Sequence, residues 1–97
     1  MPTYIALMNW TDQGIRDFKD TISRAKSVND AAARLGGSIR DTFWTVGPYD
    51  LVGIADFPDD ESATAFLLSL GSMGNLRTTT LRAFNSDEMS SIISKAG

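Results

Sequence analysis

The sequence of 97 residues contains neither cysteine nor histidine. Without them the chain cannot form disulfides, thiolate nucleophiles, zinc sites ligated by cysteine and histidine, or a haem site with a histidine or cysteine axial ligand. Mechanisms that use histidine as an acid or a base, including the catalytic triad, are excluded as well. Any chemistry must therefore come from other side chains.

Basic residues are few and scattered. The chain has 9 Lys and Arg against 12 Asp and Glu, a net charge of −3, and no basic block. Nucleic-acid-binding proteins usually carry a basic stripe and membrane-surface proteins a polybasic segment, so we expect neither partner. No apolar run approaches the roughly 20 residues that span a bilayer, and the first ten residues do not resemble a secretory signal. We therefore expect a cytoplasmic protein.

What is present is the composition of an ordinary globular domain, with 42% hydrophobic and 22% charged residues. A chain of 97 residues has room for one hydrophobic core, so we expect a single domain over residues 1–97. Such a short chain buries only about two-thirds of its unfolded surface, and it gains stability by sharing a core with a second subunit.

Apolar periodicity predicts four strands and three helices. The strands fall at residues 3–10, 38–46, 50–57 and 75–84. Helices are predicted over residues 15–35, over 58–70 and from residue 86 onward. The first helix ends at Gly36 and Gly37, but its start is open, since Asp20 or Thr21 can also cap it and leave the preceding residues as a loop or a separate turn.

The predicted order is β-α-β-β-α-β followed by a short C-terminal helix. This is the ferredoxin-like α+β fold, an antiparallel sheet with both helices on one face. The first and third strands lie at its centre, and residues 38–46 and 50–57 form a hairpin around Gly47-Pro48.

Both faces of the predicted sheet are apolar. Tyr4 and Met8 point to one side of their strand, and Ile5 and Leu7 point to the other. Two helices cover only one face, and each large side chain left in water on the other forgoes about 1.5–3 kcal/mol of burial. We predict that a second copy of the chain covers this face. The alternatives are a loop-covered monomeric core or a one-sided ligand groove.

Tyr49 and Asp50, directly after the Gly47-Pro48 break, are the candidate catalytic residues. In a functional role Asp50 is a general base or ligand anchor, and Tyr49 donates to a developing oxyanion. In a structural role Asp50 accepts hydrogen bonds from turn amides and the ring of Tyr49 packs on a neighbouring loop. The sequence leaves both roles open.

Four further residues are candidates for binding a small organic ligand: Trp10, Thr45, Arg77 and Thr79. Trp10 offers a surface for stacking, Arg77 can bind a carboxylate, and the threonines can lend a hydroxyl. Each also has a structural interpretation: core or interface filling for Trp10, an ion pair for Arg77, and strand formation for the threonines. The acidic run at residues 59–61 is explained by helix capping, and no phosphate-binding loop is present, so we expect neither a metal site nor a cofactor.

Three segments, "YIALMNWTDQGIRD", "FWTVGPYD" and "GSMGNLRTTTLRAF", resemble the GYD domain family in order along the chain. The signature falls on Gly47, Tyr49 and Asp50, and the resemblance covers residues 2 to about 93. It implies a fold similar to the dimeric α/β-barrel group of ferredoxin-like proteins, in which small organic ligands often occupy a cleft between sheet and helices. That group includes cofactor-independent oxygenases, isomerases and ligand-binding modules, and no catalytic residue transfers from it to this chain.

Three functions follow as expectations. The leading one is an oligomeric protein that binds a small organic molecule between its helices and sheet, near the hairpin and Arg77. The second is a cofactor-independent oxygenase or isomerase that uses Asp50 and Tyr49. The third is a structural or regulatory assembly domain without a ligand.

Overall fold

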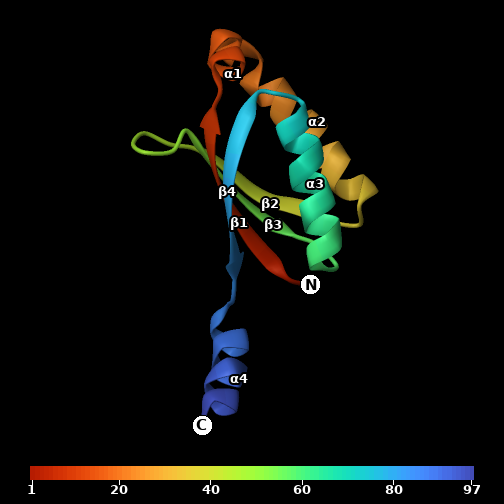
Figure 1. The fold of residues 1–97 in the computed structure, drawn as a ribbon, viewed down its shortest axis with the longest axis vertical. Helices are drawn as coiled ribbons and strands as arrows, with labels where there is room; N and C mark the ends of the chain where they lie inside the picture. The colour runs from red at the N-terminus through yellow and green to blue at the C-terminus, as the bar shows by residue number, and fades with distance from the viewer.

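A four-stranded sheet determines the architecture of the molecule (Figure 1). The computed structural model describes all of residues 1–97, and its strands are β1 (Thr3–Trp10), β2 (Ser38–Trp44), β3 (Leu51–Asp56) and β4 (Leu76–Ala83). They pair in the order β2-β3-β1-β4, and every neighbouring pair is antiparallel. The predicted ferredoxin-like fold is confirmed, with β1 and β3 at the centre of the sheet.

The helices are α1 (Asp12–Arg16), α2 (Thr21–Arg34), α3 (Asp60–Ser72) and α4 (Ser86–Ala96), with a 3-10 turn, η1 (Phe18–Asp20), between α1 and α2. The sequence did not decide where the first long helix starts, and in the structure it starts at Thr21. In α1, before it, Gly14 lies directly against the backbone of Asn75, where a side chain would not fit. Thr11 caps α1, accepting a 3.1 Å hydrogen bond from the Gly14 N–H.

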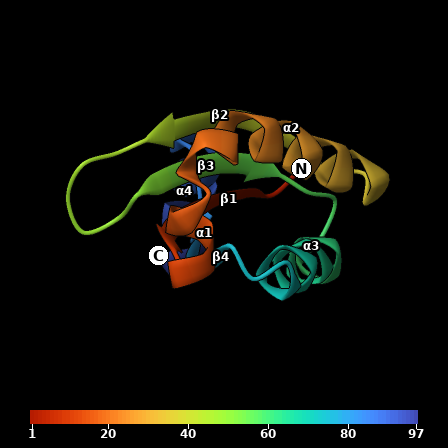
Figure 2. The same cartoon turned by 90° about the horizontal axis from the view of Figure 1, so that it is seen from above.

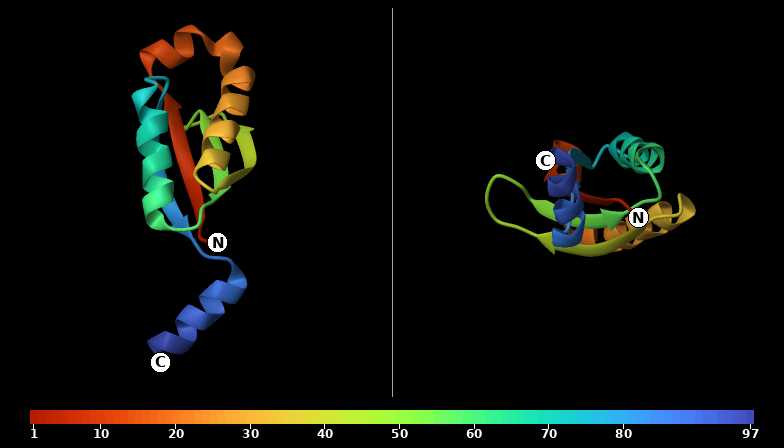
Figure 3. Two further views of the ribbon diagram at one scale, coloured as in Figure 1. Left: turned by 90° about the vertical axis from the view of Figure 1, so that its right-hand side faces the viewer. Right: turned by 90° about the horizontal axis from the view of Figure 1, so that it is seen from below.

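Helices α2 and α3 cover one face of the sheet, α2 on the side of β2 and α3 on the side of β4 (Figures 2 and 3). Between them and the sheet lies a core of ten buried residues: Tyr4, Met8, Ala31, Ala32, Leu51, Ala55, Phe57, Ala63, Phe66 and Leu70. Phe57 is only 1% exposed, and its ring centroid lies 6.2 Å from that of Tyr4 and 5.1 Å from that of Phe66. We call this the covered face.

No helix packs on the other side of the sheet, which we call the open face (Figure 1). Two rows of paired residues cross it: Phe43, Val52, Leu7 and Thr79 in one, and Asp41, Ile54, Ile5 and Leu81 in the other. Six of these eight side chains are large and apolar. The side chains of β1 and β3 thus alternate between the two faces as predicted, and those on the open face lie opposite the core.

Helix α4 extends from the end of β4 away from the sheet and the other helices (Figures 1 and 3). With α4 included, the longest dimension of the molecule is 50 Å. Asn85 and Glu88 form a capping box at its start, which satisfies backbone N–H groups that the helix leaves free. Its apolar residues Met89 and Ile93 stay 46% and 60% exposed. None of the helices is both long enough and apolar enough to cross a membrane.

Candidate functional site

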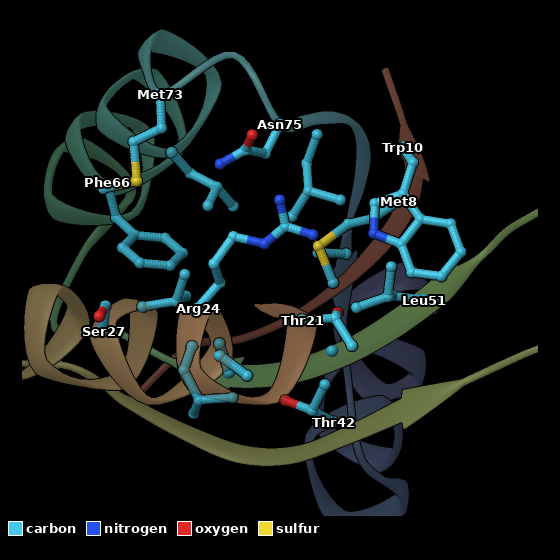
Figure 4. Close-up of a pocket in the computed structure, with 18 residues that line it drawn as sticks. Met8, Trp10, Thr21, Arg24, Ser27, Thr42, Leu51, Phe66, Met73 and Asn75 are labelled. Atoms are coloured by element: carbon cyan, nitrogen blue, oxygen red, sulfur yellow. The ribbon is translucent and has the colours of Figure 1, made fainter. Parts of the chain in front are cut away.

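A cavity of about 110 Å³ lies between the sheet and helices α2 and α3 (Figure 4). It is lined by all four strands, both helices and Asn75 in the loop before β4. Small residues in its lining, namely Ala6, Ala25, Gly53 and Ala55, leave room for this space. The covered face therefore combines a packed core with an adjoining pocket.

The lining of the cavity is mainly apolar and contains one charged side chain, Arg24 of α2. Twelve of the 18 lining residues are hydrophobic, including Trp10, Met8 and Phe66. Arg24 extends from α2 into the cavity (Figure 4), and its Nη2 donates a 3.0 Å hydrogen bond to the Gly14 carbonyl. Such a surface suits a small, largely apolar molecule that carries one recognisable polar group.

The Tyr49–Asp50 hairpin end lies outside the lining of this cavity. The carboxylate of Asp50 accepts a 3.0 Å hydrogen bond from the Trp10 N–H, and its backbone N–H donates to the Met8 carbonyl at 2.9 Å. These bonds tie the hairpin to the end of β1. Tyr49 is half-buried, and its carbonyl accepts a 2.5 Å hydrogen bond from the Thr45 hydroxyl.

Of the four ligand-binding candidates, the structure brings only Trp10 to the cavity. Thr45 closes the base of the hairpin loop, where its N–H donates to the Asp50 carbonyl at 2.9 Å. Arg77 and Thr79 pair with Asn9 and Leu7 of β1 and point to the open face, since their neighbour Leu76 lines the cavity. Arg77 forms no ion pair. The binding roles assigned to these residues stay predictions.

Two of the three acidic residues at the start of α3 accept hydrogen bonds within the chain. Asp59 caps α3 by accepting a 2.8 Å bond from the Ser62 N–H, and this bond lowers the pKa of Asp59 below its usual value. Asp60 accepts a hydrogen bond from the Tyr4 hydroxyl. Burial, together with that bond, raises the pKa of Tyr4 above 10.0. No group of three or more acidic side chains lies together in the structure as a candidate cation site.

The sequence pattern of the GYD domain matches residues 4–93. The chain belongs to the GYD family. The resemblance noted in its three segments is confirmed. The segment from Gly47 to Asp50, on which we placed the signature of the family, is fastened to β1 through Asp50. Gly47 has a φ of 136°, a conformation that side-chain-bearing residues rarely adopt.

This GYD protein is similar to a curated relative from Thermus thermophilus named "Glutamine synthetase and cystathionine beta-lyase binding protein". The two are 33% identical over 84 residues, which cover 86% of this chain and 88% of the relative. The crystal structure of TTHA0845, also from T. thermophilus, aligns with a TM-score of 0.56 at 26% identity, covering 89% of this chain and 96% of that one. The hypothetical protein PHS023 from Pyrococcus horikoshii aligns at 0.58 with 17% identity, over 89% and 93% of the two chains, and shares the fold.

Sequence reasoning missed Arg24 in this GYD domain. A signal was available, because Thr21, Arg24 and Val28 follow one another at helical steps of three and four and all three line the cavity. A charged residue within the inward stripe of a helix needs either a partner or a ligand. The candidate chosen for binding a carboxylate, Arg77, instead lies one residue beyond a cavity-lining position.

Proposed function

We propose that this GYD protein is a homo-oligomer that binds a small organic molecule in the cavity beneath α2 and α3. The observation that carries the proposal is the cavity itself, about 110 Å³ of mainly apolar space next to a well-packed core. An apolar ligand in this cavity would gain contacts with the lining side chains and would remove their apolar surface from water.

The open face supports self-association. Ile5, Leu7, Val52 and Ile54 form its centre, and Phe43 at one side is 53% exposed. Removing the apolar surface that these side chains leave exposed from water stabilises a complex, and a second copy offers a surface of the same apolar character. We propose that two sheets pack face to face.

The hydrogen bonds of Asp50 support a structural role for the signature rather than the enzyme hypothesis. A general base must reach the proton it removes, whereas the Asp50 carboxylate is bonded to the Trp10 N–H and lies outside the cavity lining. We therefore propose that Tyr49 and Asp50 hold the hairpin against β1, and that ligand binding without turnover is the activity.

Binding of another protein is a second candidate, favoured by the name of the T. thermophilus relative. By analogy, the partner would be an enzyme of nitrogen or sulfur amino-acid metabolism. Titration of purified glutamine synthetase and cystathionine beta-lyase against the immobilised full chain tests this candidate. Absence of binding by both enzymes argues against it.

The proposed oligomer is tested by sedimentation of the wild type and of Leu7→Lys over a range of concentrations. We expect the wild type to sediment as a multiple of the 10.5 kDa chain and Leu7→Lys to sediment as a monomer, because a charge at the centre of the open face cannot be buried unpaired. Leu68→Lys is the matched control, since Leu68 is 70% exposed on α3 and away from the open face. A wild type that stays monomeric at every concentration contradicts the proposal.

A further inference from the structure

We propose that the ligand is a small apolar carboxylate and that Arg24 binds its carboxylate group. This inference rests on the proposed ligand-binding function and names the ligand's chemical class. Arg24 extends from the first turns of α2 into the cavity, as Figure 4 shows, and it is half-buried there. Its position places a guanidinium within a mainly apolar chamber.

Arg24 forms no ion pair within the chain. None of the other 17 lining residues is charged, and the one ion pair of the molecule joins Arg40 to Asp56 on the other face of the sheet. A guanidinium has five N–H donors, and here the Nη2 bond to the Gly14 carbonyl is its only hydrogen bond within the chain. The remaining donors can pair with a carboxylate in the two-pronged geometry that arginine favours.

One neighbouring residue also favours an anion at this place. Asn75 lines the cavity, and its Oδ1 accepts a 3.0 Å hydrogen bond from Gln13 Nε2. That bond leaves the Nδ2 amide of Asn75 as a further donor.

The rest of the cavity selects the body of the ligand. Trp10, Phe66, Met8 and Leu51 supply aromatic and aliphatic surface, and methionine adapts to ligands of different shape. One cation in such a chamber matches one negative charge, because a second charge on the ligand would be buried without a partner. The inferred ligand is thus a monocarboxylate with an aryl or short alkyl body.

The test is calorimetric titration of the full chain with phenylacetate and hexanoate, and with their neutral amides phenylacetamide and hexanamide. We expect the wild type to bind an acid at least about tenfold more tightly than the matching amide. Arg24→Gln should weaken acid binding by about tenfold to a hundredfold and leave amide binding unchanged. The affinity of Arg24→Lys for the acids should lie between those of the wild type and of Arg24→Gln, because lysine keeps the charge and loses the two-pronged geometry.

Arg34→Gln is the matched control, since Arg34 lies exposed at the end of the same helix and outside the cavity lining. It removes an equal charge and should leave every affinity unchanged. Equal binding of acids and amides, or acid binding that survives Arg24→Gln, overturns the role of Arg24 and leaves the ligand-binding proposal standing. If neither acids nor amides bind, the ligand-binding proposal fails and the inference fails with it. If Arg24→Gln does not fold, the wild type still tests the inference, since equal binding of acids and amides would show that no cation recognises the carboxylate.

Discussion

The two faces of the sheet are built from alternate residues of the same strands, yet they end in opposite conditions. On the covered face, Tyr4, Leu51 and Ala55 are buried beneath α2 and α3. On the open face, their immediate neighbours Ile5 and Val52 have no helix above them. Strand alternation therefore produces two apolar surfaces, and the connections between strands decide that only one of them is covered within the chain.

The difference between the two faces distinguishes residues that stabilise the single chain from residues that would stabilise an assembly of chains. Burial on the covered face occurs as each chain folds, and it is independent of protein concentration. Burial on the open face requires another molecule, so the stability it adds rises with concentration. Substitutions on the two faces should consequently change the free energy of unfolding by different amounts, and only those on the open face should have an effect that depends on protein concentration.

The largest effect is expected from Phe57→Ala on the covered face. Phe57 is 1% exposed and contacts Tyr4 and Phe66, so its removal leaves a cavity that packed neighbours cannot fill. We expect the free energy of unfolding to fall by about 3–5 kcal/mol, measured by urea denaturation. A domain of this size has only about 5–15 kcal/mol in total, so this is a severe loss.

Phe43→Ala provides the matched change on the open face, because Phe43 is 53% exposed opposite Val52. In dilute solution its cost should be much smaller than that of Phe57→Ala, and it should grow as protein concentration rises. Equal losses for the two variants at every concentration would remove the distinction between the faces.

An intermediate effect is expected where α1 closes the end of the covered face. A side chain at Gly14 would place its Cβ 2.0 Å from the Asn75 carbonyl oxygen, a backbone atom that cannot turn aside. Gly14→Ala must therefore push α1 away and break the 3.1 Å bond from the Thr11 N–H to the Asn75 carbonyl. We expect a loss of about 1–3 kcal/mol, measured by thermal unfolding.

Gly71→Ala is the control for this change, since no atom lies within 4 Å of a Cβ at Gly71 in α3. Alanine favours helix over glycine, so we expect a gain of up to about 1 kcal/mol. A loss in both variants would show that the close approach at Gly14 is not the cause.

The division into two faces was predictable because it depends on local alternation. Tyr4 and Ile5 point to opposite faces for a reason visible in the sequence, and the element order likewise predicted β1 and β3 at the centre of the sheet. The cavity was predictable only as a region between helices and sheet. The residues that line it depend on where α2 packs on the sheet, which involves residues far apart in the sequence. This packing brings Arg24 to the cavity in place of Arg77.

One irregularity of the sheet also escaped sequence reasoning. The register of β2 against β3 shifts between Ile39 and Asp41, so Arg40 is an extra residue in its strand. This bulge brings Arg40 beside Asp56, with which it forms an ion pair. A bulge adds one residue without a distinctive sequence signal, and ion-pair partners beyond it cannot be read from strand spacing.

The smallest effect is expected from that ion pair, at one end of the open face. Asp56 is partly buried, which by itself would raise its pKa. The hydrogen bonds from Arg40 and Thr3, at 2.9 and 2.7 Å, outweigh burial and lower the pKa of Asp56 below 3.8. The ionised form thus stabilises the fold at pH values above the unfolded pKa, and this contribution is lost as the pH falls through the lower folded pKa.

Asp56→Asn should accordingly lower the free energy of unfolding slightly at neutral pH and flatten its dependence on pH below about pH 4. Urea denaturation at a series of pH values measures both effects. The effect is small because the Arg40 side chain is 55% exposed and water screens its charge. Arg40→Gln should flatten the same acid limb, and the double variant should add little, since both changes remove one interaction. If the acid limb keeps its wild-type slope in both single variants, the pair does not stabilise this end of the open face. Its apolar rows would then be the only part of that face that contributes to stability.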